Sequence, residues 1–391
     1  MPRGSDAGCD EDGRDGWCNE EGRGEFRRDE EMTHECVAGY AHGTIATTEG
    51  LIVSLQARPP VKLSDVAAAA EVAPMTVSRV LNSPERVSAA TAQRVRAAIE
   101  RLGYVPNLVA GGLSSRRTRM VAAIVPTMAH PMFAELVQNF TDALRARGYE
   151  VMLSLSGYDE VSEAALVRAV LARRPDALLL TGATHDGPTR QMLADAAIPV
   201  VEVFDVARRP IDMLVGVDHA AAGAAVAAYF RAKGHERFAV FGASDARAQL
   251  RAASFAAAAR RGGGTVVAET VIPAPSTIGA GRAALRELVP ALLAAAAQGR
   301  RTALFCSSDV VAFGALVEAA AHGVAVPDAL AVCGFGDFEL SAASDPPFTT
   351  VSVEGARIGR HAAMFVLDRL DGAADARRVQ VPFRVIERAS S

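Results

Sequence analysis

The stretch VKLSDVAAAAEVAPMTVSRVLN, residues 61–82, predicts two short helices joined by one tight turn. In its first half, apolar residues recur at helical spacing, and Ser64 stands where it can cap the start. These apolar residues are Leu63, Val66, Ala67 and Ala70. Residues 71–73 interrupt the pattern, and Pro74 suits the first turn of a second helix because its missing N–H costs nothing there. The stretch therefore predicts a helix-turn-helix pair.

The second helix of this pair has one apolar face and one polar face. Val77, Val80 and Leu81 are expected to be buried. The other face carries short polar groups and one guanidinium, from Met75, Thr76, Ser78, Arg79 and Asn82. Such a set can enter a major groove, read base edges and bond to phosphates. A helical hairpin with an ordinary solvated face fits the same pattern, so the neighbouring sequence has to decide between the two.

Residues 88–102 predict a third amphipathic helix that ends at Gly103. Its inward residues are Val95, Ile99 and Leu102. Three motifs, TVSRVLN, VSAATAQRV and LGYVPN, follow one another between residues 76 and 107. In their order and spacing these motifs resemble the DNA-binding headpiece of the lactose/galactose repressor (LacI/GalR) family. The resemblance implies a sequence-specific DNA-binding protein.

The resemblance also implies which side chains contact DNA. Pro74, Met75 and Arg79 would face the major groove, and four further residues would lie at phosphates or groove edges. Those four are Thr76, Ser78, Asn82 and Arg86. Two positions depart from the family pattern: Leu108 replaces a frequent Arg, and Ala73 replaces the usual Ser or Thr before the recognition helix. The second change removes an expected capping hydroxyl.

By the same resemblance, the segment from Asn107 to Ser114 would be a hinge helix that folds only on operator DNA. Asn107 would contact the DNA, and Leu113 would be the apolar wedge inserted into the minor groove. Independently of the resemblance, Gly111 and Gly112 make this segment too weak a helix to stand alone. Folding coupled to DNA binding is therefore expected.

The charge of the chain is unevenly distributed. The net charge is −4 over 391 residues, and residues 1–58 carry thirteen acidic side chains against six Arg. Residues 59–119 carry nine basic side chains against four acidic ones, so the basic charge is local to the predicted DNA module. No run of 18 apolar residues indicates a membrane span, and the acidic N-terminus does not match a secretory signal. A cytoplasmic protein is expected.

The five cysteines are scattered, and none forms a Cys-x-x-Cys pair. A zinc site from Cys9, Cys18, His34 and Cys36 can be imagined, but the spacings are loose and the segment is almost without apolar residues. Cys306 and Cys333 stand in apolar strand contexts and are expected to be buried as small hydrophobic residues. No metal and no cofactor is predicted.

The chain divides into four parts by pattern: a disordered acidic leader (1–58), the headpiece (59–105), the hinge helix and linker (106–118) and a body (119–391). In the body, short buried strands alternate with amphipathic helices, which indicates parallel sheets covered by helices. The expected strands are 121–125, 149–155, 177–180, 199–204, 238–241, 265–272, 303–306 and 330–335. The alternation starts again after residue 217, so a two-lobed α/β body is expected, with a ligand site at the carboxyl ends of the strands.

The resemblance to the LacI/GalR family continues through the body, in the motifs GHERFAVFGA, VPDALAVCGFGD and PPFTTV. It implies a periplasmic-binding-protein-like body whose first lobe spans 119–217 and 351–377, and whose second spans 218–350 and 378–391. The chain would then cross between the lobes three times. No leucine heptad follows residue 380, so a homodimer is expected rather than a tetramer.

Polar residues just past strand ends are the candidates for effector binding, since polyhydroxy ligands need paired hydrogen bonds with charged anchors. Arg251 matches the effector-contacting Arg of the family, and Arg247 lies one turn earlier on the same helix face. Phe133 stands where the family places an aromatic ring against the ligand. Further candidates are Thr127, His130, Asp205 and Asp309. A solvated arginine, a core phenylalanine and helix-capping aspartates are the alternatives for these positions.

Within the family, four motifs are similar to the gluconate-utilisation repressor branch: VPTMAHPMFAEL, SGYD, LLLTGATHDGPT and IPVVEVFD. Thr181, Thr184 and His185 follow the strand-end loop of that branch. Gluconate is a carboxylate with five hydroxyls, so Arg251, Arg247 and His185 facing one cleft would suit it. Ser308 stands where the family often has Asn, and Gly336 where many sugar-responsive members have Asp. These changes argue against a neutral galactoside.

The leading hypothesis is a repressor of carbohydrate catabolic genes that binds operator DNA as a dimer and responds to a sugar or sugar acid. A solute-binding component of a sugar transporter would share the two-lobed body but would need an export signal and no headpiece. An α/β enzyme is the third alternative. The sequence has no Gly-x-Gly-x-x-Gly, Walker or Gly-x-Ser-x-Gly motif, so no enzymatic activity is predicted.

Overall fold

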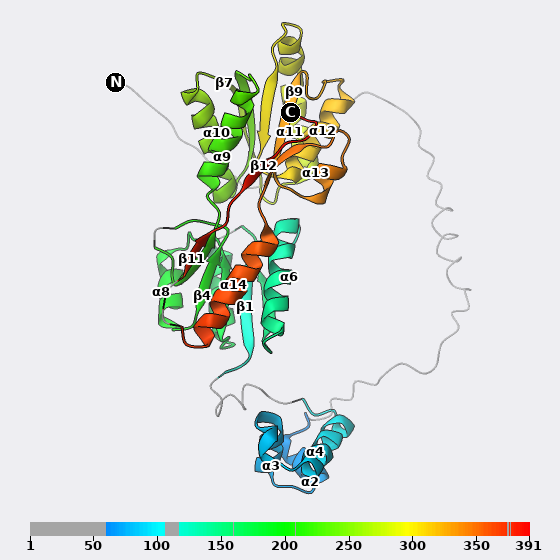
Figure 1. The fold of residues 1–391 in the computed structure, drawn as a ribbon, viewed down its shortest axis with the longest axis vertical. Helices are drawn as coiled ribbons and strands as arrows, with labels where there is room; N and C mark the ends of the chain where they lie inside the picture. Colours follow the sequence, from blue (N-terminus) through cyan, green and yellow to red (C-terminus); the bar gives the residue numbers. More distant parts are fainter. Residues whose placement is uncertain (1–59, 106–116, 159, 208, 374, 376) are drawn as a thin grey trace, which may run out of the picture.

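The computed structural model describes residues 60–105, 117–158, 160–207, 209–373, 375 and 377–391. These residues form a small helical headpiece and a body of two α/β lobes (Figure 1). The expected leader, most of the expected hinge and the four residues considered for zinc lie outside the described residues.

The headpiece consists of three helices around a small apolar core. They are α2 (Leu63–Ala69), α3 (Pro74–Asn82) and α4 (Ala89–Leu102), with a 3-10 turn η1 (Pro84–Arg86) between the last two. Val66, Val77 and Val95 are fully buried, one from each helix. The tight turn between α2 and α3 includes Glu71 at a φ of 52°. The predicted helix-turn-helix pair and its third helix are confirmed.

The helix ends of the headpiece differ in one respect from the prediction. Helix α2 begins at Leu63, one residue before Ser64, and its N-cap residue is Lys62. The Asp65 carboxylate accepts a hydrogen bond from the Lys62 N–H at 2.8 Å, so the acidic residue caps this end and Ser64 does not. At α3 the N-cap Ala73 makes no side-chain hydrogen bond, as its missing hydroxyl predicts. Gly103 ends α4 with a φ of 62°.

The first lobe contains a six-stranded parallel sheet in the order β11-β5-β4-β3-β1-β2. Its strands are β1 (Met120–Val125), β2 (Glu150–Leu155), β3 (Ala177–Thr181), β4 (Val200–Val203), β5 (Met213–Gly216) and β11 (Arg378–Gln380). Its helices are α6 (Pro131–Arg145), α7 (Glu160–Leu171), α8 (Gly187–Asp195) and α14 (Gly355–Leu370). Strand β1 is apolar on both faces, because α6 and α14 pack on one side and α7 and α8 on the other.

The second lobe repeats this plan with the strand order β12-β10-β9-β8-β6-β7. Its strands are β6 (Arg237–Ala243), β7 (Thr265–Ile272), β8 (Thr302–Cys306), β9 (Leu330–Gly336), β10 (Thr349–Ser352) and β12 (Arg384–Ile386). Its helices are α9 (His219–Ala232), α10 (Ala246–Arg261), α11 (Ile278–Ala296), α12 (Asp309–Ala321) and α13 (Glu339–Ala343). Only β12 runs antiparallel to its neighbour among the described strands. Cys306 and Cys333 are buried in this lobe, as predicted.

Two of the predicted lobe boundaries are wrong by a few residues. Strand β10 pairs with β9, so the second lobe continues to residue 352 instead of ending at 350. Strand β11 pairs with β5, so the first lobe continues to residue 380 instead of ending at 377. The chain thus crosses near residues 217, 353 and 382. These bounds came from the family resemblance alone, since β10 and β11 are too short to show a periodic pattern that would have placed them.

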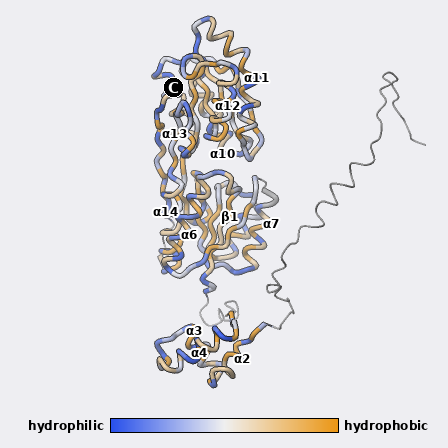
Figure 2. The backbone as a smooth tube through the Cα atoms, turned by 90° about the vertical axis from the view of Figure 1, so that its right-hand side faces the viewer, coloured by the Kyte–Doolittle hydropathy of each residue, from blue (hydrophilic) through white to orange (hydrophobic). Residues whose placement is uncertain are grey.

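Apolar residues are concentrated on the strands, while the connecting turns are hydrophilic (Figure 2). One continuous core runs through both lobes and includes residues of α6, α9, α10 and α14. None of the described helices is both long enough and apolar enough to span a membrane.

Helices α9 and α10 approach each other closely at Gly223. A Cβ added there would lie 2.2 Å from the carbonyl oxygen of Arg251, which is closer than atoms can pack. This glycine therefore sets the separation of the two helices, and with it the position of Arg251.

We predict that Gly223→Ala lowers the free energy of unfolding by about 1–3 kcal/mol, because the added methyl forces α9 and α10 apart. Gly279→Ala is the matched control, since a Cβ at that helical glycine would have its nearest neighbour at 3.9 Å. The control is expected to stay within about 0.5 kcal/mol of the wild type in urea denaturation. Equal effects of the two substitutions would contradict the assigned close contact.

Candidate functional site

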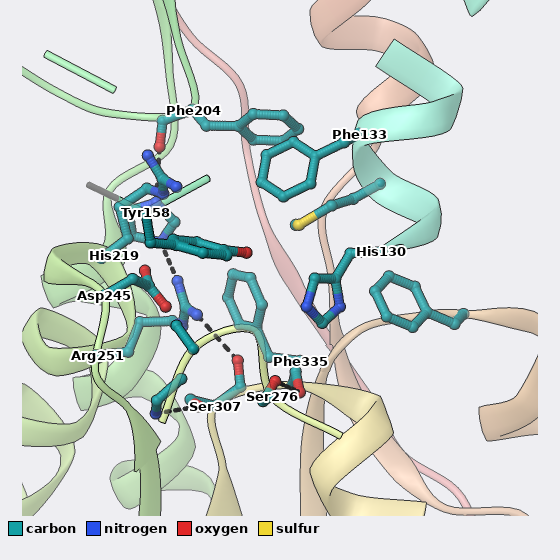
Figure 3. Close-up of a pocket in the computed structure, with 16 residues that line it drawn as sticks. His130, Phe133, Tyr158, Phe204, His219, Asp245, Arg251, Ser276, Ser307 and Phe335 are labelled. Atoms are coloured by element: carbon teal, nitrogen blue, oxygen red, sulfur yellow. Dashed lines mark hydrogen bonds between the residues drawn. The ribbon is translucent and has the colours of Figure 1, made fainter. Parts of the chain in front are cut away.

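A cavity of about 540 Å³, including the space at its mouth, lies between the two lobes (Figure 3). From the first lobe it is lined by His130, Met132, Phe133, Tyr158 and Phe204. From the second lobe it is lined by His219, Ala243, Asp245, Arg247, Arg251, Ala274, Ser276, Ser307, Ser308, Phe335 and Phe338. A cleft between two lobes is a common place for a small ligand to bind.

The fold brings these residues together because parallel strands end at the same edge of a sheet. In the first lobe, lining residues follow β1, β2 and β4. In the second lobe, they follow β6, β7 and β8 or stand at the end of β9. The predicted cleft at the carboxyl ends of the strands is thus present.

Arg251 is the central charged group of the cavity, although only 7% of its surface is exposed. One terminal nitrogen of its guanidinium donates to Nδ1 of His219 at 3.0 Å, and the other donates to the carbonyl of Ser307 at 2.9 Å. The guanidinium carbon lies 3.9 Å from the centre of the Phe335 ring, which gives a cation–π contact. The Nε atom is buried without a partner. Burial lowers the pKa of Arg251 to about 10, so it remains a cation at neutral pH.

Arg247 adds a second cation at the same wall of the cavity, and its guanidinium extends to the first lobe. A Cβ at Gly182 would lie 3.1 Å from its Nη1 atom. Among the described residues, no carboxylate forms an ion pair with Arg247 or Arg251. Asp245 lines the cavity too, but its carboxylate accepts from the N–H of Ala248 and caps α10.

Four helices begin at the cavity and point their positive ends toward it. Helices α6, α10 and α12 have His130, Asp245 and Ser308 as N-cap residues, and α9 begins with His219. Helix N-termini stabilise negative charge within about one turn. Together with the two arginines, they make the cavity suited to an anionic group.

Aromatic rings line the cavity from both lobes. The rings of Phe133 and Phe204, from the first lobe, meet edge to face at 5.3 Å (Figure 3). Phe335 and Phe338 line the cavity from the second lobe, where Phe335 contacts Arg251. Tyr158 is neutral, because burial raises the pKa of its hydroxyl to about 12. Burial likewise lowers the pKa of His130 below its ordinary value. The cavity therefore offers two arginines and one carboxylate from the second lobe, neutral donors and acceptors from both lobes, and aromatic rings from both lobes.

Of the eight predicted effector contacts, the structure brings four together in this cavity: His130, Phe133, Arg247 and Arg251. The other four do not line it. Thr127 accepts from the N–H of Ala129 within its own turn, and Asp205 accepts from the N–H of Val206. Asp309 is fully buried beneath the cavity, where it accepts from the N–H of Phe338 and the hydroxyl of Thr350.

His185 is one of the four residues that do not line the cavity. Its side chain is fully buried between two carboxylates, 2.5 Å from Glu163 and 3.3 Å from Glu202. The two carboxylates raise the pKa of His185 to about 9, despite the opposing effect of burial. The imidazolium thus stabilises the loop after β3 from inside the first lobe and is not available to a ligand.

The sequence analysis did not select most of the other residues that line the cavity. Asp245, Ser276, Ser307 and Ser308 stand just past strand ends, so the rule used for the other candidates could have found them. Tyr158 lies in the motif SGYD and follows β2 in the same way. Phe204, His219 and Phe335 carry no comparable signal, because apolar strand residues and a histidine after Asp218 are ordinary features.

The predicted DNA-contacting residues of the headpiece lie on an accessible face. Pro74, Arg79, Asn82 and Arg86 are exposed, Met75 is 62% exposed, and Thr76 and Ser78 are half-buried. Asn82 donates to the carbonyl of Ser78 at 3.0 Å, one turn earlier on α3. Asn107 and Leu113 lie outside the described residues. The geometry leaves the polar face of α3 free to enter a groove.

Comparison with known proteins agrees with this arrangement. Residues 62–107 match the sequence pattern of bacterial regulatory proteins of the lacI family, and residues 227–391 match a periplasmic binding protein-like domain. The HTH-type transcriptional regulator GntR of Pseudomonas aeruginosa is 35% identical over 312 residues, which cover 79% of this chain and 89% of the relative. The chain belongs to the lacI family. The predicted resemblance, including its gluconate-utilisation branch, is confirmed.

Solved structures of the family have the same architecture. A lacI-family regulator from Silicibacter pomeroyi superimposes with a TM-score of 0.78 at 29% identity, covering 85% of this chain and 99% of that one. The structure of the transcriptional regulator CelR in complex with cellobiose gives a TM-score of 0.60 at 29% identity, covering 85% and 100%. This chain is therefore a transcriptional regulator of the lacI family, and a transporter component does not account for its headpiece.

We predict that the stability of the protein falls as the pH rises through about 9, because His185 then loses its charge. The pKa of this residue is raised in the folded state, so its contribution is complete below its ordinary value of 6.5 and is lost above the folded value. Urea denaturation at pH values between 6.5 and 9.5, roughly this window, measures the effect. In His185→Gln, the same pH series should show a much smaller decline, and an unchanged slope would disprove the assignment.

Proposed function

We propose that the chain is a dimeric repressor that binds operator DNA through its headpiece and is released when a sugar acid such as gluconate binds between the lobes. The observation that supports this most directly is the pair of arginines, Arg247 and Arg251, which face the cavity without a carboxylate partner among the described residues. The guanidinium of Arg251 is buried with neutral hydrogen-bond partners and no ion pair, and Asp245 is the one carboxylate that acts on it electrostatically among the described residues. Burying a charge in this way is costly, and an anionic ligand would reduce that cost.

The position of Gly336 supports an acid rather than a neutral sugar. The family resemblance implies Asp at this position in many sugar-responsive members, whereas the φ of Gly336 is 132° and a Cβ there would lie 2.5 Å from the ring of Phe338. Phe338 therefore occupies the space that a side chain at 336 would need. Replacing a carboxylate by an aromatic ring removes a negative charge that would repel an anionic ligand.

The remainder of the cavity suits a polyhydroxy compound. The hydroxyls of Ser276 and Ser308 lie 3.2 Å apart, and Tyr158 and His130 present neutral polar groups from the other lobe. Hydroxyl groups of a sugar acid can bond to these, while its C–H face packs on the phenylalanines. The relative CelR is itself known in complex with cellobiose, a sugar. The resemblance to the gluconate-utilisation branch favours an aldonic acid among such ligands.

We place the dimer contact of the second lobe at the edge of its sheet. Strand β7 is the edge strand, and α10 and α11 both pack against it. Each of these three elements carries an exposed apolar residue: Val271, Leu250 and Ile278. Exposed apolar side chains on one edge are typical of an interface.

A transcriptional regulator has to reach the chromosome to bind its operator. We therefore propose that the protein is located in the cytoplasm, and we assign it no enzymatic activity.

For the headpiece, Arg79→Ala is expected to lower affinity for a specific duplex by about 1–3 kcal/mol and to relax the preference at one base position. The duplex is selected by the full chain from a randomised pool and measured by fluorescence anisotropy. Arg96→Ala, at an exposed position of α4, is the matched control and should leave the base preference unchanged. An equal loss of affinity on every sequence would mean that Arg79 contacts only phosphate.

For the body, gluconate is expected to weaken binding of the full chain to that duplex. Arg251→Ala should reduce gluconate affinity about 10- to 100-fold in calorimetry, since a hydrogen bond to a charged group contributes about 1.5–3 kcal/mol. Arg260→Ala, at an exposed position near the end of the same helix, is the control and should bind as the wild type does. If gluconate leaves DNA affinity untouched, the assignment of the ligand is wrong while the DNA-binding role stands.

A further inference from the structure

A short path of buried hydrogen bonds connects the two lobes through His219 (Figure 3). We propose that His219 is a positioning residue that couples the orientation of Arg251 to the arrangement of the lobes. It would thereby transmit effector binding to the first lobe. This inference rests on the proposed function, in which Arg251 contacts the effector.

The contacts on the Arg251 side are internal to the second lobe. Nδ1 of His219 accepts from the guanidinium at 3.0 Å, and Ser307 holds the other terminal nitrogen at 2.9 Å. The close approach of α9 and α10 at Gly223, one turn after His219, fixes the backbones that carry these two side chains. Arg251 and His219 are therefore expected to move as one unit.

The contact on the other side reaches the first lobe. Nε2 of His219 donates to the carbonyl of Phe204 at 2.6 Å, and Phe204 directly follows β4. The backbone of Phe204 has a φ of 66°, and its N–H bonds to the carbonyl of Val215 at 3.0 Å. A phenylalanine in the left-handed region is held there by its surroundings, so this carbonyl has a defined direction.

Strand β5 is followed by Val217, where the chain first crosses between the lobes, and His219 lies two residues later. A rotation of the lobes about the crossings changes the geometry of the bond to Phe204 before it affects the bond to Arg251. Conversely, a ligand that turns the Arg251 guanidinium moves the N–H group from which Nδ1 of His219 accepts. The imidazole thus links the ligand to the relative position of the lobes.

The hydrogen-bonding capacity of a buried neutral imidazole restricts which partners His219 can have. Such a ring has one donor and one acceptor, and here Phe204 takes the donor while Arg251 takes the acceptor. Only 2% of the surface of His219 is exposed, so water does not readily replace either partner. Changing one bond therefore leaves a buried polar group unsatisfied, which is unfavourable.

Two amide variants separate the halves of the link. In His219→Asn, the amide oxygen lies near the place of Nδ1 and can still accept from Arg251, but the side chain is too short to reach Phe204. In His219→Gln, the amide nitrogen lies near the place of Nε2 and can still donate to Phe204, but the acceptor for Arg251 is lost. His235→Asn, at another buried histidine of the second lobe that does not line the cavity, is the matched control.

The experiment uses the full chain, gluconate and a duplex selected by the wild type. Calorimetry gives the gluconate affinity, and anisotropy gives the DNA affinity with and without gluconate. His219→Asn should keep more of the gluconate affinity than His219→Gln does, while the effect of gluconate on DNA affinity falls about tenfold. His219→Gln should instead lose about tenfold in gluconate affinity. His235→Asn should retain both properties.

The outcomes distinguish this inference from the function on which it rests. If the wild type does not bind gluconate, both fail together. If the wild type binds and responds but His219→Asn responds equally, only the role of His219 is overturned. Thermal melting shows which variants are folded, and if His219→Asn does not fold, an unchanged gluconate affinity in His219→Gln overturns the inference.

Discussion

The parallel direction of the strands is the constraint on which this structure depends. Because every strand of a parallel sheet ends at the same edge, the loops after β1, β2 and β4 meet those after β6, β7 and β8 at one junction. The helices that follow these strands must then begin there, which directs their positive ends to the same place. The order and direction of the strands and helices thus make the cavity electropositive, independently of its side chains.

The side chains then make that character specific. A buried guanidinium needs partners for its donors, and Arg251 finds them in a histidine ring, a carbonyl and an aromatic face, without a carboxylate. Neutral partners satisfy its geometry, and Asp245 acts on it only without a direct ion pair, so the charge remains available to a ligand. The His185 cluster shows the contrast, because there two carboxylates surround one imidazolium and the charge is satisfied within the protein.

The same contrast explains what could be predicted from the sequence. Periodicity located the headpiece helices and the long strands, because burial on one or both faces leaves a repeating pattern. It missed β5, β10, β11 and β12, which are three or four residues long. The family resemblance selected Arg251, helical spacing added Arg247, and both line the cavity. The resemblance also selected His185, and strand-end position selected Asp309, because neither criterion tells whether a side chain points to the cleft or into its own lobe. That choice depends on partners such as Glu202 and Thr350, which are distant in sequence.

A change in the relative position of the lobes must reach the headpiece through the residues just before β1. The structure shows that these residues are firmly attached to the first lobe. The carboxylate of Asp176 accepts from the backbone N–H groups of Thr118 and Arg119, each at 2.8 Å. These bonds fix the chain to the loop before β3 just as it enters the first lobe. A loose attachment would absorb a rotation of the lobe, whereas a fixed one passes it on. Because each half of a dimer carries one such attachment, a small rotation in each lobe changes the separation of the two linkers, and a near-palindromic operator is sensitive to that separation.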